Sequence, residues 1–389
     1  MVCDHSRRQL LVGAAATAIV PNASYAAAAA SAWETVAPAA AGFSTDIEAR
    51  LDKLIADKRV WGLHGVLVAR GRRIAMERYF EGAENSWGKV SQVRFGPDVL
   101  HNLYSVTKSI VALVYGIALG EGKVPPPEAP LYEQFPEYAD LTAADGRRKE
   151  RTVRHALTMT LGLQWDEIDV PYSDLRNDEV GMERARDRYR FVLERPVIGP
   201  PGKRWLYSGG ATALLGRIIA RGTGRSLPDY ARTALFDPAG LGPTEWMSNK
   251  DTWVVADFGP GDGEPLAASG LRMTPRDLAR IGQLVIDQGV ANGRQVVPAG
   301  WLEQCMTPRV SADELRRYGY QWYVGDMEFR SQSGVRLEHW VGAFGNGGQR
   351  LFVFPELELI VVTTAGNFTP DQWMPPIRVL REAVLPSLL

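Results

Sequence analysis

The sequence has little cysteine and little histidine. Only two of its 389 residues are cysteine and five are histidine. Cys3 lies in the N-terminal segment discussed below, so the rest of the chain holds Cys305 alone and cannot form an internal disulfide. The histidines beyond residue 32 have no His-x-x-x-His spacing, which leaves a zinc site without support. We therefore expect a chain that is stabilised by its core and needs no metal or cofactor.

An excess of charge of one sign is also absent. The 44 Lys and Arg residues nearly balance the 45 Asp and Glu residues, which gives a formal net charge of −1. This balance offers no electrostatic footprint for nucleic acid or for an anionic membrane. A hydrophobic fraction of 45% and a charged fraction of 23% are ordinary for a globular protein. The length suits one large domain or two closely packed ones.

Long hydrophobic runs are missing as well. The weakly apolar stretch from Leu10 to Val20 is too short to span a bilayer comfortably. It follows Arg7 and Arg8, and the alanine-rich residues after it end in an Ala-x-Ala cleavage site at residues 30–32. This pattern predicts a twin-arginine export signal over residues 1–32 and a periplasmic or secreted protein with no stable membrane anchor after processing. An uncleaved anchor is the alternative.

Apolar periodicity predicts the organisation of the rest of the chain. Residues 42–62 show the period of an amphipathic helix, and residues 64–80 alternate like an antiparallel hairpin. Helical patterns dominate from 125 to 260, and strand patterns return beyond Tyr318. We therefore expect the α/β (α+β) class. One antiparallel sheet domain would be built from residues 33–120 and 262–389, with an all-helical insert at 121–261.

The motif Ser-x-x-Lys occurs twice, and its context separates the two copies. Ser86 lies in "SWGK", among charged and turn-forming residues that would not hold the serine against the lysine. Ser105 and Lys108 instead begin a long apolar helical run, which places them on one helix face with Cβ atoms about 5–6 Å apart. A serine there could attack a carbonyl carbon if a buried, neutral lysine accepted its proton. The alternative without catalysis is that Ser105 caps the helix and Lys108 is a surface lysine.

Two further segments carry groups suited to acyl transfer. In "PGKRWLYSGG", Tyr207 stands at the start of a predicted helix, where a nearby ammonium would lower its phenol pKa and make it a second proton acceptor. In "GAFGNGGQRLFVF", a glycine-rich bend from Gly345 to Gly348 leads into a strand and could present oxyanion N–H groups. Alone, each segment also fits ordinary packing or a simple hairpin turn.

In this order and spacing, the three motifs resemble the serine β-lactamase-related family. That family includes class C β-lactamases, D-Ala-D-Ala carboxypeptidases, family VIII-type esterases and 6-aminohexanoate-dimer hydrolases. The resemblance implies a β-lactamase/transpeptidase-like fold, with a central antiparallel sheet flanked by helices. It also implies that Ser105 is the nucleophile and that Lys108 and Tyr207 share the proton transfers. The oxyanion would lie between the N–H groups of Ser105 and Asn346, beside Gly345.

Two departures from the family pattern concern the substrate. Gly209 stands where the usual Tyr-x-Asn motif has its asparagine. The usual Lys-Thr-Gly or His-Thr-Gly motif becomes Ala-Phe-Gly at 343–345, or Trp-Val-Gly at 340–342 with His339 just outside it. Neither placement supplies a lysine for the carboxylate of a penicillin, although His339 could compensate in part. The stretch "GNGGQRLFVFPELELIVV", residues 345–362, most closely resembles the branch of 6-aminohexanoate-dimer hydrolases and related esterases.

These features predict a serine hydrolase that acts on small esters or linear amides, with a small-molecule substrate as its only expected partner. Tyr172, in the loop "WDEIDVPYSD", is the expected contact for a substrate amine or amide. A weak β-lactamase or D-Ala-D-Ala carboxypeptidase is the nearest alternative. A non-catalytic ligand-binding protein on the same fold is the alternative from another class. The pattern leaves the oligomeric state open.

Overall fold

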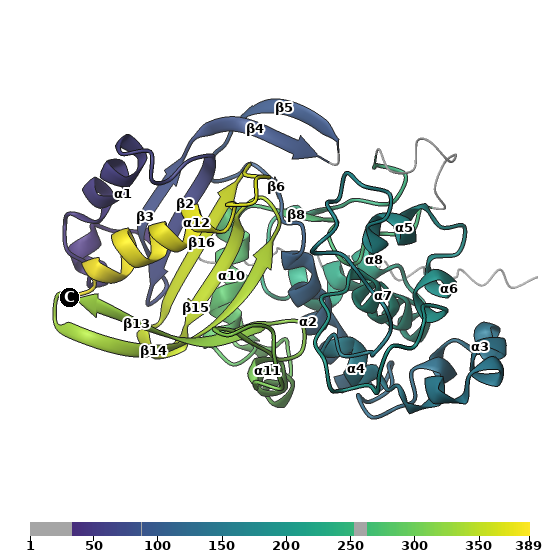
Figure 1. The fold of residues 1–389 in the computed structure, drawn as a ribbon. Helices are drawn as coiled ribbons and strands as arrows, with labels where there is room; N and C mark the ends of the chain where they lie inside the picture. The colour runs from purple at the N-terminus through teal and green to yellow at the C-terminus, as the bar shows by residue number, and fades with distance from the viewer. Residues whose placement is uncertain (1–32, 87, 253–262) are drawn as a thin grey trace, which may run out of the picture.

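The computed structural model describes residues 33–86, 88–252 and 263–389. A large sheet with helices on both faces forms one part of the molecule, and a group of helices packs beside it (Figure 1). The predicted export signal lies outside the described residues. Within the part of the chain that is described, no helix has the length and apolar character needed to cross a membrane.

Nine strands form the central sheet, in the order β1-β3-β2-β16-β15-β14-β13-β12-β11. All neighbours pair antiparallel except the short edge strand β1, which is parallel to β3. The sheet is thus mixed, although almost wholly antiparallel. Its strands are β1 (Glu34–Thr35), β2 (Leu63–Arg70), β3 (Arg73–Tyr79), β11 (Val310–Ser311), β12 (Arg317–Tyr318), β13 (Tyr323–Ser331), β14 (Gly334–Gly345), β15 (Gln349–Phe354) and β16 (Leu359–Ala365).

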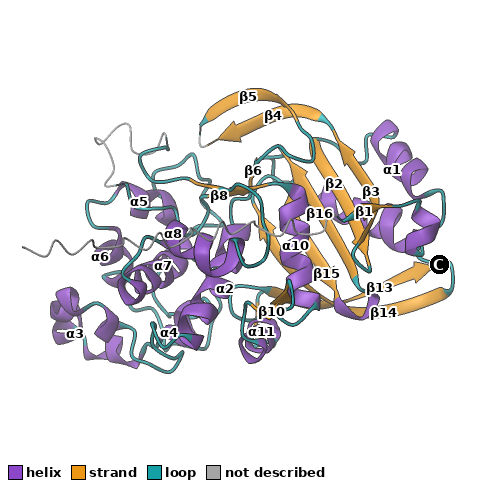
Figure 2. Cartoon of the chain, turned by 180° about the vertical axis from the view of Figure 1, so that it is seen from behind, coloured by secondary structure: helices purple, strands orange, loops and turns teal. Residues whose placement is uncertain are grey.

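Both faces of the central strands are covered, which explains their continuous apolar sequences. Side chains alternate between the faces along a strand. In β15, Leu351 and Val353 enter one hydrophobic core, whereas Phe352 and Phe354 enter the other. The first core packs under α10 (Pro275–Ile286), which crosses the sheet in Figure 2. The second lies under α1 (Ile47–Ala56), α12 (Met374–Arg378) and the helical segment Val379–Val384.

Helix α2 (Val106–Gly120) joins the sheet to the helical region, because it contacts both β14 and α7 (Gly209–Thr223). Its residues are buried from Val106 to Ala118, as expected for a helix that is apolar on all sides and packed from all sides. The other helices are α3 (Ala139–Ala144), α4 (Val153–Leu157), α5 (Asp178–Arg184), α6 (Arg188–Leu193), α8 (Leu227–Ala231) and, beside the sheet, α11 (Ala299–Met306).

Small sheets position the segment that precedes α2. The strand β6 (His101–Asn102) pairs with β8 (Leu271–Met273), and β8 pairs with β7 (Glu245–Trp246). The hairpin of β4 (Glu81–Ser86) and β5 (Lys89–Arg94) extends from the end of the main sheet (Figures 1 and 2). A further pair, β9 (Val290–Ala291) and β10 (Arg294–Gln295), lies far from α2 in sequence.

Candidate active site

Ser105 lies at the N-cap of α2, three residues after the end of β6. Its hydroxyl makes no capping hydrogen bond, and the residue is 9% exposed in a cavity of about 630 Å³. Tyr104 holds the left-handed backbone conformation, with φ of 47°, although it is neither glycine nor asparagine. Strained backbone of this kind costs about 1–3 kcal/mol and clusters at functional sites. The turn thus presents the serine at the positive end of a helix.

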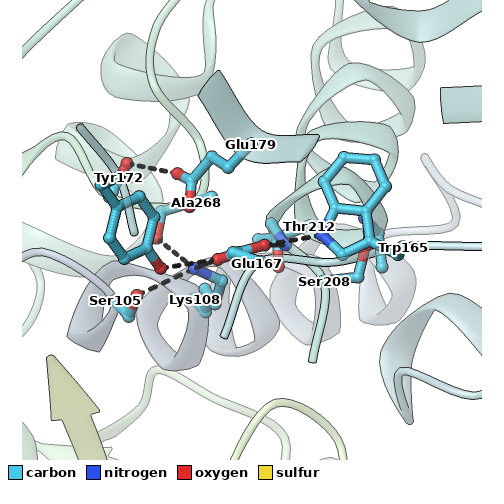
Figure 3. A network of polar contacts seen from close by, with 12 residues as sticks. Ser105, Lys108, Trp165, Glu167, Tyr172, Glu179, Ser208, Thr212 and Ala268 are labelled. Carbon is cyan, nitrogen blue, oxygen red and sulfur yellow. Dashed lines mark hydrogen bonds and ion pairs between the residues drawn. The ribbon is translucent and has the colours of Figure 1, made fainter. Parts of the chain in front are cut away.

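Lys108 lies one helical turn after Ser105 and is almost completely buried, with 1% exposure. Its Nζ donates a hydrogen bond of 2.9 Å to the Ser105 Oγ and another of 3.2 Å to the Ala268 carbonyl oxygen. The same Nζ lies 3.7 Å from Oε1 of Glu167. Figure 3 shows the lysine amine among these three groups. The predicted Ser-Lys pair is therefore in hydrogen-bond contact, which is the geometry a nucleophile needs beside a proton-transfer group.

Tyr207 immediately precedes Ser208, the N-cap of α7. The centre of its ring lies 4.8 Å from Lys108 Nζ, and it forms a side-chain hydrogen bond with Ser105. Burial, together with the nearby Tyr323, raises the pKa of the Tyr207 phenol well above its usual range. The expectation of a lowered pKa was wrong, because desolvation of the phenolate outweighs the favourable contacts. Tyr207 is therefore a neutral phenol in the resting site.

Two glutamates that sequence analysis did not single out complete this group. Glu167 and Glu179 are 2% and 4% exposed. Glu167 comes from the loop before α5, and Glu179 lies in the first turn of α5. The Glu167 carboxylate accepts hydrogen bonds from Trp165 Nε1 at 2.8 Å and from the Gly209 N–H. The only sequence signal was the loop itself, in which Glu167 stands five residues before Tyr172.

The cavity beside Ser105 has an acidic, aromatic and apolar lining. Tyr172 and Asn346 both line it, and the Tyr172 hydroxyl donates to Glu167 Oε1 at 3.1 Å. Burial raises the pKa of Tyr172 well above its usual range. Among the described residues, no lysine or arginine belongs to the lining. It comprises Asn85, Gly88, Tyr104, Ser105, Glu167, Ile168, Val170, Pro171, Tyr172, Ser173, Glu179, Val180, Glu183, Thr252, Ser269, Asn346, Phe368, Thr369, Pro370 and Gln372.

The glycine-rich bend reaches the same site from β14. A Cβ added at Gly345 would lie 2.2 Å from the carbonyl oxygen of Leu103, so only glycine lets β14 approach the segment that leads to Ser105. Asn346 follows, and its carbonyl oxygen accepts a hydrogen bond of 3.0 Å from Gln349 Nε2. Gly347 and Gly348 then adopt φ values of 83° and 101°. The bend therefore places Asn346 in the wall of the cavity that holds Ser105.

Two residues considered from sequence lie elsewhere. His339 is on β14 opposite Asp326 of β13, and its Nδ1 lies 3.1 Å from the Asp326 Oδ1. Its side chain is 44% exposed and does not line the cavity, so its position does not support a role in substrate binding. Ser86 is paired with Lys89 across the β4–β5 hairpin, and its Oγ accepts a hydrogen bond of 3.1 Å from Arg272. The second Ser-x-x-Lys motif therefore lies in a β-hairpin and not at the start of a helix.

Metal ligands do not gather in the part of the chain that is described. No three His, Cys, Asp or Glu residues among those residues are arranged to hold a metal ion. The chemistry that this site can perform with its own groups is nucleophilic attack by Ser105 with proton transfer through Lys108 and Tyr207.

The fold is that of the β-lactamase/transpeptidase-like class, whose family consists of serine hydrolases. The family profile "Beta-lactamase" matches residues 47–381, and the chain belongs to that family. A 6-aminohexanoate-dimer hydrolase from Paenarthrobacter ureafaciens is 28% identical over 344 residues, which cover 84% of this chain and 76% of that protein.

Solved structures show the same fold. EstCE1, a hydrolase with promiscuous acyltransferase activity, superposes with a TM-score of 0.63 and 16% identity, over 87% of this chain and 97% of that one. A class C β-lactamase from Rhodobacter sphaeroides superposes with a TM-score of 0.62 and 19% identity, over 88% and 99%. These likenesses concern the fold.

Proposed function

We propose that the chain hydrolyses small esters or linear amides through an acyl-enzyme formed on Ser105. The observation that carries this proposal is the 2.9 Å hydrogen bond between Lys108 Nζ and Ser105 Oγ at the wall of a 630 Å³ cavity. A serine hydroxyl becomes an effective nucleophile when a neighbouring group takes its proton as it attacks.

The reaction has two halves. Attack starts from the form of the site in which the Lys108 amine is neutral. Ser105 Oγ attacks the carbonyl carbon while its proton passes to the Lys108–Tyr207 pair, and the backbone N–H groups of Ser105 and Asn346 stabilise the oxyanion. The pair then protonates the leaving alcohol or amine, which departs and leaves the acyl-enzyme. Water repeats the sequence on the ester bond to Ser105 and releases the acid. Tyr172 lines the cavity and donates to Glu167, which supports it as the contact for the substrate amide.

The lining of the cavity favours uncharged acyl groups over carboxylates. Its described residues include no lysine or arginine, and aromatic and apolar side chains such as Tyr104, Ile168 and Phe368 form much of the wall. A penicillin carboxylate would enter without a cationic partner, at a desolvation cost that a neutral ester avoids. The relative named for 6-aminohexanoate-dimer hydrolysis supports linear amides as the second substrate class. Weak β-lactam or D-Ala-D-Ala turnover is the alternative that the β-lactamase relatives favour.

Intact-mass spectrometry after treatment with a fluorophosphonate tests the nucleophile. We expect one adduct on the wild type and on Ser86→Ala, and none on Ser105→Ala. Hydrolysis of a p-nitrophenyl ester, the 6-aminohexanoate dimer and a chromogenic cephalosporin then ranks the substrates, and Ser105→Ala should lose about 10³-fold or more in kcat. Absence of any adduct on the wild type would favour the ligand-binding alternative. A cephalosporin rate equal to the ester rate would favour the β-lactamase one.

Export to the periplasm belongs to the same proposal and rests on Arg7, Arg8 and the segment after them. Cell fractionation of the full-length chain, compared with Arg7→Lys/Arg8→Lys, tests it directly. Retention of the variant in the cytoplasm is the expected result.

A further inference from the structure

Two buried carboxyl groups lie beside the proposed nucleophile, where the reaction as described gives them no role. Glu167 and Glu179 are 2% and 4% exposed, and glutamate is rarely buried to this extent without partners. Lys108, also buried, is the nearest cation, at 3.7 Å from Glu167 Oε1. For two buried acids beside one buried lysine, the question is which of the two carboxyl groups is ionised.

The contacts of Glu167 are those of an anion. Its carboxylate accepts hydrogen bonds from Trp165 Nε1 at 2.8 Å, from the Tyr172 hydroxyl at 3.1 Å and from the backbone N–H of Gly209. The Lys108 ammonium adds an ion pair on the Oε1 side (Figure 3). Three donors and one cation stabilise an ionised carboxylate more than a protonated carboxyl group, which has less capacity to accept hydrogen bonds.

Glu179 has the opposite surroundings. Its Oε1 accepts one hydrogen bond of 3.0 Å, from Ser269 Oγ, and it forms a side-chain hydrogen bond with Glu167. Two adjacent carboxylates in a buried site cannot both be ionised at acceptable cost, so one of them keeps a proton. Burial and the charge of Glu167 raise the pKa of Glu179 well above its usual range, while Lys108 and these hydrogen bonds lower the pKa of Glu167. The charged or titratable groups that face the pair are Lys108, Tyr172, Glu183 and Tyr207.

We propose that Glu167 is a positioning residue, whose carboxylate holds the Lys108 amine against Ser105, and that Glu179 supports it as a protonated hydrogen-bond donor. This inference rests on the proposed function of Ser105. The two carboxyl groups occupy the place left by the asparagine that the family pattern has at position 209. A Cβ on Gly209 would lie 3.0 Å from Glu179 Cδ and 3.2 Å from Glu167 Oε2, so a larger side chain there would displace the pair.

Glu167 would act through Lys108 in two ways. It fixes the amine, because Ala268 O and Ser105 Oγ alone leave the lysine without a charged partner among the described residues. It also balances the positive charge that Lys108 carries when it holds a proton during attack and departure of the leaving group. If the two glutamates only stabilised the fold, they would make the same contacts. The catalytic rate would then not depend on which of the two carboxyl groups is ionised.

The matched variants Glu167→Gln and Glu179→Gln test this distinction, because each neutralises one carboxyl group with almost no change in shape. In Glu179→Gln the new amide can donate an N–H to Glu167 as the protonated acid does, so kcat should fall much less than in Glu167→Gln. Glu167→Gln removes the anion beside Lys108, so kcat should fall by about 100-fold, with KM less affected. The acidic limb of the kcat/KM profile should also move to lower pH, because Lys108 takes the Ser105 proton as a neutral amine and loss of a neighbouring anion disfavours its ammonium form.

Fluorophosphonate labelling of Ser105 separates this inference from the function it rests on. If the wild type is not labelled and has no hydrolytic activity, the proposed function fails. If the wild type is labelled and Glu167→Gln retains its rate and pH profile, the positioning role is refuted. Equal losses in both variants, with unchanged pH profiles and matching falls in thermal midpoint, would also overturn it in favour of a structural role.

Discussion

Two clusters of ionisable side chains are equally buried in this molecule, but they differ in charge. The histidine pair is neutral, whereas Glu167, beside Lys108, is ionised. His64 and His101 are each 2% exposed, and their rings are joined by a contact of 2.8 Å between Nδ1 of His64 and Nε2 of His101. His64 also stacks on Phe95, with ring centroids 4.2 Å apart. Burial lowers the pKa of His64 to about 3 and that of His101 to about 4, so both are neutral. Glu167 is as deeply buried, but Lys108 and the hydrogen bonds that it accepts lower its pKa despite the burial, so this carboxylate is ionised.

The difference in charge comes from the neighbouring side chains and not from the extent of burial. Among the described residues, no acidic side chain lies within ion-pair distance of either buried histidine, so each one avoids the cost of a buried charge by losing its proton. Glu167 has three hydrogen-bond donors and the Lys108 amine 3.7 Å away, which together offset that cost. A charged group costs free energy to bury. The cluster that contains such a group is the one in contact with Ser105.

The largest effect is expected from Lys108→Met, which leaves Glu167 as an unpaired buried anion. We expect the free energy of unfolding to fall by about 3–5 kcal/mol, as when one partner of a buried ion pair is removed. Urea denaturation of the wild type and the variant measures this. Hydrolysis should be lost as well, because Ser105 then has no amine beside its hydroxyl.

The double variant Lys108→Met/Glu167→Gln separates the two losses. Neutralising Glu167 should restore much of the stability, because no unpaired charge remains, but it should not restore activity. If the double variant is as unstable as Lys108→Met, the ion pair is not the reason for the instability, and the contrast with the histidine cluster fails.

A second prediction concerns acid stability and the histidine pair. Because the folded pKa values lie below the unfolded value of about 6.5, the unfolded chain binds protons first as the pH falls. The pair therefore costs stability from about pH 6.5 downward, with the cost growing by about 1.4 kcal/mol per pH unit for each histidine until the folded pKa is reached. Urea midpoints between pH 7 and pH 4.5 measure the slope.

His64→Gln/His101→Gln is the matched variant, since glutamine keeps hydrogen-bonding groups but does not titrate there. Its unfolding free energy should depend less steeply on pH than that of the wild type. Parallel slopes would show that the histidines are not buried as neutral groups.

Sequence predicted the parts of the site that local structure fixes. Ser105 and Lys108 share one helical turn, and Tyr207 stands at the start of another helix, so short-range patterns were enough to single them out. The nearly antiparallel sheet likewise follows from the period of its strands. The start of α10 is equally local, because Pro275 is its first residue and Thr274 accepts a capping hydrogen bond of 3.1 Å from Asp277 N.

Contacts across the fold were not accessible in the same way. Glu167 comes from an irregular loop, and its burial depends on α5, α7 and α2 meeting around it. Tyr323 lies on β13, more than a hundred residues from Tyr207, yet contributes to the raised pKa of that phenol. The direction of that shift was missed for the same reason, since desolvation is a property of the assembled site. His339 was favoured by its place next to a motif, but strand alternation turns it to the exposed face.

A smaller effect is expected from Gly209→Ala. The added methyl group would press on Glu179 Cδ at 3.0 Å, and a flexible carboxyl group can move aside. Stability should change by less than about 1 kcal/mol, because alanine favours the helix by a similar amount. The rate should nevertheless fall about tenfold, because the displaced acids no longer hold Lys108 in place. Gly300→Ala, near the start of α11 with nothing within 4 Å of the added Cβ, is the control and should be silent in both respects.

The smallest effect is expected from His339→Ala, which completes the comparison among histidines. His339 has the acidic partner that the buried pair lacks, Asp326 at 3.1 Å, but the two side chains are 44% and 65% exposed. An exposed pair contributes little, so the unfolding free energy should change by at most about 0.5 kcal/mol. Hydrolysis should be unchanged, because the residue does not line the cavity of Ser105. A clear loss of activity with any of the three test substrates would instead return His339 to the binding site, and the carboxylate-binding role first considered for it would have to be reopened.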